Sequence, residues 1–161
     1  MLKTGVSCVD ITPPVGISLV GFAEREPSSI GVHDRLKATS LVISDGEMTA
    51  ALASSDLLHV DDSLVKMVRE EANRRTGIPE KQITVACTHT HYGPAVAEFE
   101  ASLKGADYVA AYRACLKFYL AGGIQEAFSN MQEASLGLGW GTSHIGINRR
   151  ERCPDGRIIL G

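Results

Sequence analysis

A strand–helix–strand pattern in the middle of the chain constrains the fold more than any other feature of the sequence. The apolar run MTAALASS at 48–55 predicts a strand, and the stretch at 61–77 predicts a helix that places Leu64 and Val68 on one face. A second apolar run, QITVACTHTH at 82–91, predicts another strand. Two strands joined by a helix lie parallel in one sheet with a right-handed crossover. We therefore predict a βαβ unit.

A β-hairpin is predicted immediately before this unit. The segment LKATSLVI at 36–43 has the composition of a strand, and SDGE at 44–47 separates it from the strand at 48–55. Asp-Gly between apolar runs is a strong hairpin signal. A further strand is predicted at 6–11, where a following Pro-Pro pair ends the ladder. The expected fold class is α/β, a mixed β-sheet with a βαβ unit, an antiparallel hairpin and covering helices.

The second half of the chain predicts two helices and two strands. A short helix is expected at 94–105 and a longer one at 107–128. Charged residues and a Gly-Gly pair inside the longer segment favour a buried core helix over a membrane span. Strands are expected at 133–141 and after a turn within 154–160.

Length and composition indicate one folding unit over residues 1–161, because this length suits one domain with a core. The hydrophobic content of 44% and the charged content of 22% are those of a globular protein. A net charge of −3 without a clustered cationic face argues against nucleic-acid binding. The N-terminus lacks the apolar core of a secretory signal, so we expect cytoplasmic residence.

The stretch CTHTHYGP at 87–94 places two histidines at the carboxyl end of a predicted parallel strand. The period of two along a strand predicts that His89 and His91 project from one face. Asp56 ends the other parallel strand and is a candidate orienting partner for a metal-bound imidazole. Such a histidine pair suits zinc, or one ligand beside one catalytic imidazole. It is equally compatible with two hydrogen-bonded histidines near a turn, since zinc needs three or four ligands.

Four motifs, taken together and in order, resemble the N-terminal region of the neutral/alkaline, non-lysosomal ceramidase family. They are DITPPVG at 10–16, GVHDRLKATSLVI at 31–43, THTHYGP at 88–94 and GINRR at 146–150. The resemblance implies a zinc amidohydrolase that cleaves the amide bond of an N-acylated lipid base through metal-activated water. The substrate expected on this basis is a small-molecule or lipid amide.

The resemblance also implies roles for individual residues. His89 would be a zinc ligand, and His91 would lie by the scissile amide as a polarising or proton-handling group. Arg149 would hold an oxygen of the substrate, although an exposed arginine can equally form an ion pair with a nearby carboxylate. His33 matches a motif position whose role stays open. Tyr92 stands where the family carries serine, so a larger ring would narrow the entrance or supply a hydroxyl.

In the family, the remaining metal ligands and the active-site serine lie downstream of the NR motif. The sequence therefore predicts an incomplete N-terminal part of the hydrolase domain, with zinc weak or absent in the isolated chain. One alternative is a non-catalytic remnant that acts as a binding or assembly module, whose exposed edge strands favour homo-oligomers. Another is a different small hydrolase that uses only His89, His91, Asp56 and Arg149.

Overall fold

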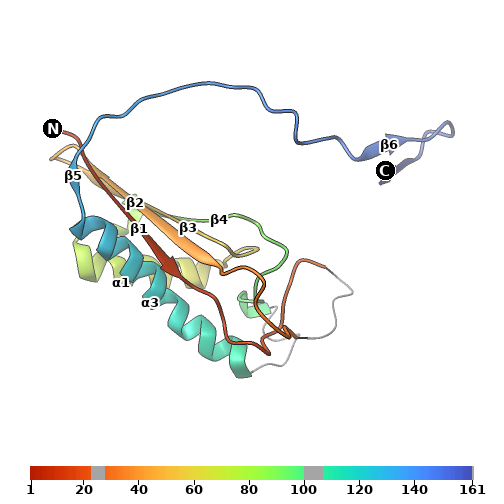
Figure 1. The fold of residues 1–161 in the computed structure, drawn as a ribbon, viewed down its shortest axis with the longest axis horizontal. Helices are drawn as coiled ribbons and strands as arrows, with labels where there is room; N and C mark the ends of the chain where they lie inside the picture. The colour runs from red at the N-terminus through yellow and green to blue at the C-terminus, as the bar shows by residue number, and fades with distance from the viewer. Residues whose placement is uncertain (23–27, 100–106, 161) are drawn as a thin grey trace.

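A five-stranded mixed sheet forms the centre of the computed structural model, which describes residues 1–22, 28–99 and 107–160. The strand order is β4-β3-β2-β1-β5, and two helices, α1 and α3, cover one face of the sheet (Figure 1). The strands are β1 (Lys3–Asp10), β2 (Lys37–Ser44), β3 (Thr49–Ser55), β4 (Ile83–Cys87) and β5 (Gln132–Glu133). Antiparallel pairing joins β1, β2 and β3, whereas β3 and β4 pair in parallel. The predicted α/β fold with a hairpin, a βαβ unit and covering helices is confirmed.

Helix α1 (Asp62–Thr76) connects the two parallel strands and has the ends that the sequence predicts. The Asp61 carboxylate accepts a hydrogen bond from the Leu64 N–H at 2.9 Å, which caps the first turn. Gly77 ends the helix in the left-handed conformation, with φ of 74°. Leu64 and Val68 are fully buried, so the predicted apolar face is the one that packs into the core. A short 3₁₀ helix, η1 (Glu80–Gln82), leads into β4.

Helix α3 (Asp107–Ser129) packs very closely against β1. A Cβ placed on Gly5 would lie 1.9 Å from the carbonyl oxygen of Ala127, so only glycine fits at that strand position. The Gly123 carbonyl accepts a 2.7 Å hydrogen bond from the buried Ser7 hydroxyl. The prediction of a core helix is confirmed by its buried apolar side chains, which include Leu116. Within the described ranges, no helix has the length and apolar character needed to cross a bilayer.

Three sequence-based expectations for the secondary structure are wrong. The strand expected at 82–91 ends at Cys87. The helix expected at 94–105 does not begin at Pro94, because Pro94 forms a β-bridge with Leu19. Helical backbone starts at residue 98, and residues 100–105 of the expected helix lie outside the described residues. Of the strand expected at 133–141, only Glu133 lies in a strand. That strand is β5, whose two residues pair with Lys3 and Thr4 of β1.

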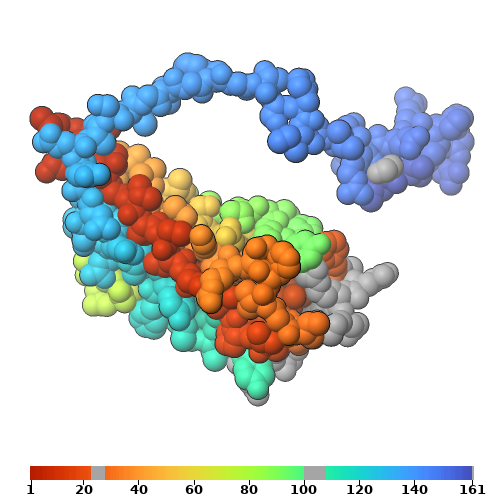
Figure 2. Space-filling model, viewed as in Figure 1, coloured from red at the N-terminus to blue at the C-terminus, as the bar shows by residue number. Residues whose placement is uncertain are grey.

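Residues 134–160, here called the C-terminal arm, leave the sheet after β5. Residues 134–149 form neither helix nor strand, and the arm ends in a hairpin of β6 (Arg150–Arg152) and β7 (Ile158–Leu160). The predicted turn into a last strand is therefore confirmed. Figure 2 shows the arm arching away from the body of the protein. Its large apolar side chains are exposed, namely Leu136, Leu138, Trp140, Ile145, Ile147, Ile158, Ile159 and Leu160.

Candidate functional site

The segment after β4, residues 88–95, carries both candidate histidines and is here called the histidine loop. His89 has φ of 63°, a left-handed conformation that is uncommon for residues other than glycine. This turn breaks the strand alternation on which the prediction of a shared face rested. The rings nevertheless meet, because the centroids of His89 and His91 lie 5.1 Å apart at an interplanar angle of 79°. Loop geometry, rather than strand periodicity, brings the two imidazoles together.

The ring of His89 is oriented by the backbone of a neighbouring segment. Its Nδ1 lies 2.9 Å from the carbonyl oxygen of Leu58, and its backbone N–H donates to the Leu57 carbonyl at 3.1 Å. Because a carbonyl oxygen only accepts, Nδ1 carries a proton, and in the neutral ring Nε2 then presents its lone pair. His89 is exposed, whereas His91 is half-buried. A histidine whose second nitrogen donates to a carbonyl has the arrangement typical of a metal ligand.

Asp56 lies at the carboxyl end of β3, next to the start of the histidine loop. Its two carboxylate oxygens accept from the Lys37 N–H at 2.9 Å and from the Thr88 hydroxyl at 3.2 Å. The structure therefore places the Leu58 carbonyl, and not Asp56, against the His89 ring. Asp56 instead joins the ends of three strands beneath the loop.

The histidine loop is also paired with the segment at 18–22. The Val20 N–H donates to the Gly93 carbonyl, and the Ala95 N–H donates to the Ser18 carbonyl, each at 3.0 Å. This short antiparallel pairing places Phe22 beside the histidines. The Phe22 and His91 ring centroids lie 5.4 Å apart with an interplanar angle of 73°.

A charged network holds the chain directly after the histidine loop. The Arg113 guanidinium, on α3, donates to the Val96 carbonyl and to the Asp61 carboxylate, with 2.7 Å between Nη2 and Oδ1. The other Asp61 oxygen accepts from the Glu98 N–H at 2.9 Å. Burial raises the pKa of Asp61, but hydrogen bonds from Arg113, Leu64, Glu98 and Ser63 outweigh it and hold this pKa well below its usual range. The network connects both helices to the loop.

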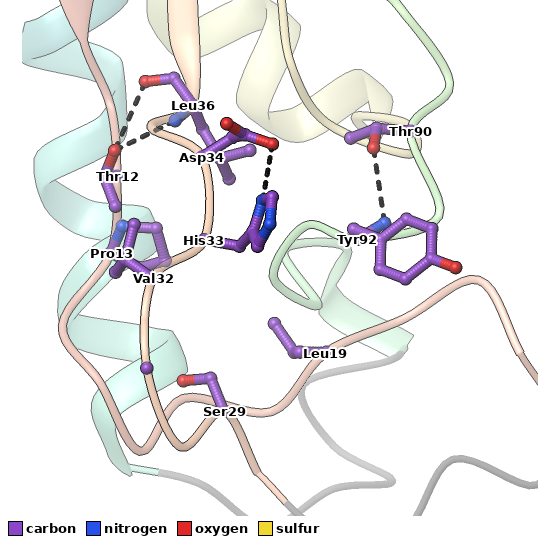
Figure 3. Close-up of a pocket in the computed structure, with 11 residues that line it drawn as sticks. Thr12, Pro13, Leu19, Ser29, Val32, His33, Asp34, Leu36, Thr90 and Tyr92 are labelled. Carbon is purple, nitrogen blue, oxygen red and sulfur yellow. Dashed lines mark hydrogen bonds and ion pairs between the residues drawn. The ribbon is translucent and has the colours of Figure 1, made fainter.

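A cavity of about 570 Å³ opens beside the histidine loop. Figure 3 shows His33 at its centre, with Thr12 and Pro13 on one side and Thr90 and Tyr92 on the other. His33 is almost fully exposed, and its Nδ1 lies 2.8 Å from the Asp34 carboxylate. Tyr92, which follows the histidines, is also exposed and lines this cavity. The structure thus brings His33 and Tyr92 to one side of the loop that carries His89 and His91.

Arg149 lies in the C-terminal arm, directly before β6. Figure 1 shows β6 standing apart from the end of β4, where the histidine loop begins. The structure therefore brings together His89 and His91 and, around the cavity, His33 and Tyr92, but it does not bring Arg149 to them.

The donor set fits one part of a zinc site. Nδ1 of His89 donates to the Leu58 carbonyl, which leaves Nε2 of the neutral ring available to a metal, and His91 lies beside it. Among the described residues, however, no group of three or more histidine, cysteine or acidic side chains lies close enough to hold a metal ion. Structural and catalytic zinc sites use at least three protein ligands. The described residues would therefore supply at most part of the ligand set of a zinc ion.

Sequence reasoning missed three residues that shape this site. Leu58 contributes only its carbonyl, so its side-chain type carries no signal. Gly21 and Phe22 come from a loop more than sixty residues before the histidines, and only the pairing at 18–22 reveals their position. The one available hint was the residue type, because glycine is favoured where φ is positive and the structure gives Gly21 a φ of +111°.

Comparison with known proteins identifies the family. The family model described as neutral/alkaline non-lysosomal ceramidase, N-terminal, matches residues 2–153. The chain belongs to this family. The resemblance noted from the four motifs is thereby confirmed, and the match includes the histidine loop.

Relatives and a solved structure agree with this family. Neutral ceramidase 3 of Arabidopsis thaliana is 29% identical over 94 residues, which is 56% of this chain and 13% of that protein. Neutral ceramidase of Drosophila melanogaster is 31% identical over 96 residues, which is 57% of this chain and 14% of the relative. The crystal structure of neutral ceramidase from Pseudomonas aeruginosa superposes with a TM-score of 0.70 at 19% identity. That alignment covers 81% of this chain and 22% of the ceramidase, so it supports the fold alone.

Proposed function

We propose that this chain is the histidine-bearing N-terminal part of a ceramidase-like, zinc-dependent amidohydrolase that acts on an N-acyl lipid amide. The proposal rests on family membership and on one observation above all. The His89 ring donates through Nδ1 to the Leu58 carbonyl, and its centroid lies 5.1 Å from that of the His91 ring. In metal sites, a hydrogen bond of this kind fixes the tautomer and the orientation of the imidazole that binds the metal.

In this proposal His89 is the metal ligand that the chain contributes. A bound zinc would supply an activated water near neutral pH for attack on the amide carbon. His91, half-buried beside His89, would polarise the amide oxygen or hold a proton during the reaction. Arg149 would reach the substrate oxygen only if the C-terminal arm folded back toward the histidine loop. The remaining ligands are assigned to polypeptide outside the described residues, and the site is incomplete without them.

The cavity beside the loop supports an amide substrate with an apolar part. It combines apolar side chains, including Leu19, Val32 and Leu36, with the polar groups of Thr90 and His33. A mainly apolar cavity with a few convergent polar groups is typical of small-molecule sites. An acyl chain would lie against the apolar wall of this cavity, whose lining includes Thr90 and Tyr92 of the histidine loop but neither His89 nor His91.

Zinc binding to the purified chain tests this proposal directly. We expect weak zinc binding, measured by competition with a chromophoric chelator, and its loss in His89→Ala. The matched control is His144→Ala, because His144 is an exposed histidine in the C-terminal arm. Equal zinc affinity in the wild type and in His89→Ala would refute the assigned ligand. Zinc-dependent release of fatty acid from a fluorescent N-acyl sphingosine, lost in His91→Ala, would show a working site in this chain.

A non-catalytic assembly module is the second candidate, and the exposed apolar surface favours it. The sheet face away from the helices carries a register row of Val6, Leu41 and Leu52, and Val6 is 55% exposed. The C-terminal arm adds further exposed apolar side chains. Uncovered apolar surface of this kind is typical of interaction sites. Light scattering during size-exclusion chromatography would support this candidate if the chain were an oligomer that bound no zinc.

Cytoplasmic residence remains a proposal. Fractionation of cells that express the natural gene tests it, and recovery outside the cytoplasm would refute it.

A further inference from the structure

The backbone at Gly21 lies in direct contact with His91. A Cβ built on Gly21 would lie 2.5 Å from both Cα and Cβ of His91 and 2.8 Å from its Cγ. These atoms belong to the backbone and the first bonds of the side chain, so no rotation of a flexible end relieves the clash. Gly21 also has φ of +111°, which favours glycine independently.

We infer that Gly21, together with Phe22, is the positioning element for His91, an assignment whose catalytic meaning rests on the proposed function. The Gly21 backbone supports the base of the His91 side chain. The Phe22 ring supports the imidazole, with a centroid distance of 5.4 Å, and also contacts the Tyr92 ring at 5.7 Å. His89 lies against the same imidazole at 5.1 Å. His91 is therefore held by the segment at 18–22 and by His89.

A methyl group at Gly21 would displace His91 by a distance that the contacts of Gly21 define. Ordinary contact begins near 3.4 Å, so His91 must move by about 0.9 Å to accept a Cβ that would otherwise lie at 2.5 Å. Misplacement of a reacting group by about 1 Å can reduce a rate about a hundredfold. Gly21 would act only through His91, and this makes it a positioning residue rather than a catalytic one.

The test compares Gly21→Ala with Gly16→Ala. Gly16 has φ of +98°, so alanine there suffers the same kind of backbone strain, but its Cβ would have no heavy atom within 4 Å. Nuclear Overhauser effects between the His89 and His91 rings are measured by NMR without metal. We expect these effects to weaken clearly in Gly21→Ala and to keep their wild-type intensity in Gly16→Ala. Effects of wild-type intensity in a folded Gly21→Ala variant would overturn the inference.

A second pair of variants covers the case in which Gly21→Ala does not fold. Phe22→Leu removes the ring that supports His91, and Phe118→Leu is the matched control, because both phenylalanines are 48% exposed. We expect weaker nuclear Overhauser effects between His89 and His91 in Phe22→Leu only. Equal effects in the two leucine variants would overturn the inference.

Zinc affinity separates this inference from the proposed function. If the wild type binds zinc, we expect the affinity of Gly21→Ala or Phe22→Leu to fall about tenfold or more, because the displaced His91 ring lies against the ligand His89 and helps to orient it. Unchanged zinc affinity in these variants would refute the positioning role while leaving His89 as a ligand. If Gly21→Ala separates the two rings and the wild type binds no zinc, the positioning role is supported and the proposed metal site is refuted.

Discussion

Arg113→Met tests the charged network that holds the chain directly after the histidine loop. The Arg113 side chain is 10% exposed and the Asp61 side chain 26%, with 2.7 Å between Nη2 and Oδ1. Methionine retains most of the apolar stem but removes every guanidinium donor. The Val96 carbonyl, on a residue that is 1% exposed, then loses the guanidinium donor.

The expected loss of stability is about 3 kcal/mol. A hydrogen bond to a charged group contributes about 1.5–3 kcal/mol net, and a buried carbonyl left without its donor costs about 1–3 kcal/mol. Water that reaches the partly exposed Asp61 carboxylate offsets some of this, so the total stays near the low end of about 3–5 kcal/mol measured for broken buried pairs. For a chain of this size the melting temperature should fall by about 6–12 °C.

Urea denaturation, followed by circular dichroism, measures the free energy of unfolding. The control is Arg35→Met, because Arg35 forms a 2.7 Å ion pair with Asp10 in which the side chains are 73% and 45% exposed. An exposed pair contributes about 1 kcal/mol or less, so this variant should unfold close to the wild type. If the two methionine variants lost the same stability, the argument that burial makes the Arg113 network important would be wrong.

Four further substitutions test the packing and the electrostatics of the fold. Gly5→Ala should prevent native packing of α3, since the new methyl would meet the Ala127 carbonyl; a dispersed, native-like NMR spectrum would contradict this. Ser40 has a buried hydroxyl without a hydrogen-bond partner in the part of the chain that the structure describes, so Ser40→Ala should be neutral or stabilising by up to about 1 kcal/mol in urea denaturation. Ser7→Ala, which removes a 2.7 Å hydrogen bond, should instead destabilise by about 1 kcal/mol. Because the folded-state pKa of Asp61 is depressed, its contribution to stability is present above about pH 4 and is lost as the pH falls below that value. Urea midpoints between pH 6 and 3 should show this decline, and Asp61→Asn should flatten it while retaining the helix cap; an unchanged slope would contradict the assignment.

Local patterns were sufficient to predict most of the sheet and both long helices. The Asp-Gly turn, the caps of α1 and its apolar face are short-range signals, and each appears in the structure as expected. The strand expected at 133–141 failed because the residues of a segment do not show whether a neighbouring strand is available to pair with it. A strand needs such a neighbour, and only Gln132 and Glu133 find one on β1.

For the candidate site, the sequence by itself determined which side chains are chemically able to act. Two imidazoles, a tyrosine and a further histidine were recognisable from residue type and motif alone. Tertiary structure decided their geometry: the left-handed turn at His89, the Leu58 carbonyl behind its ring and the Gly21 backbone against His91. The last two of these features join segments that are distant in the chain, and both are made through backbone atoms. Backbone atoms are common to all residues, so no pattern of side chains predicts these two contacts.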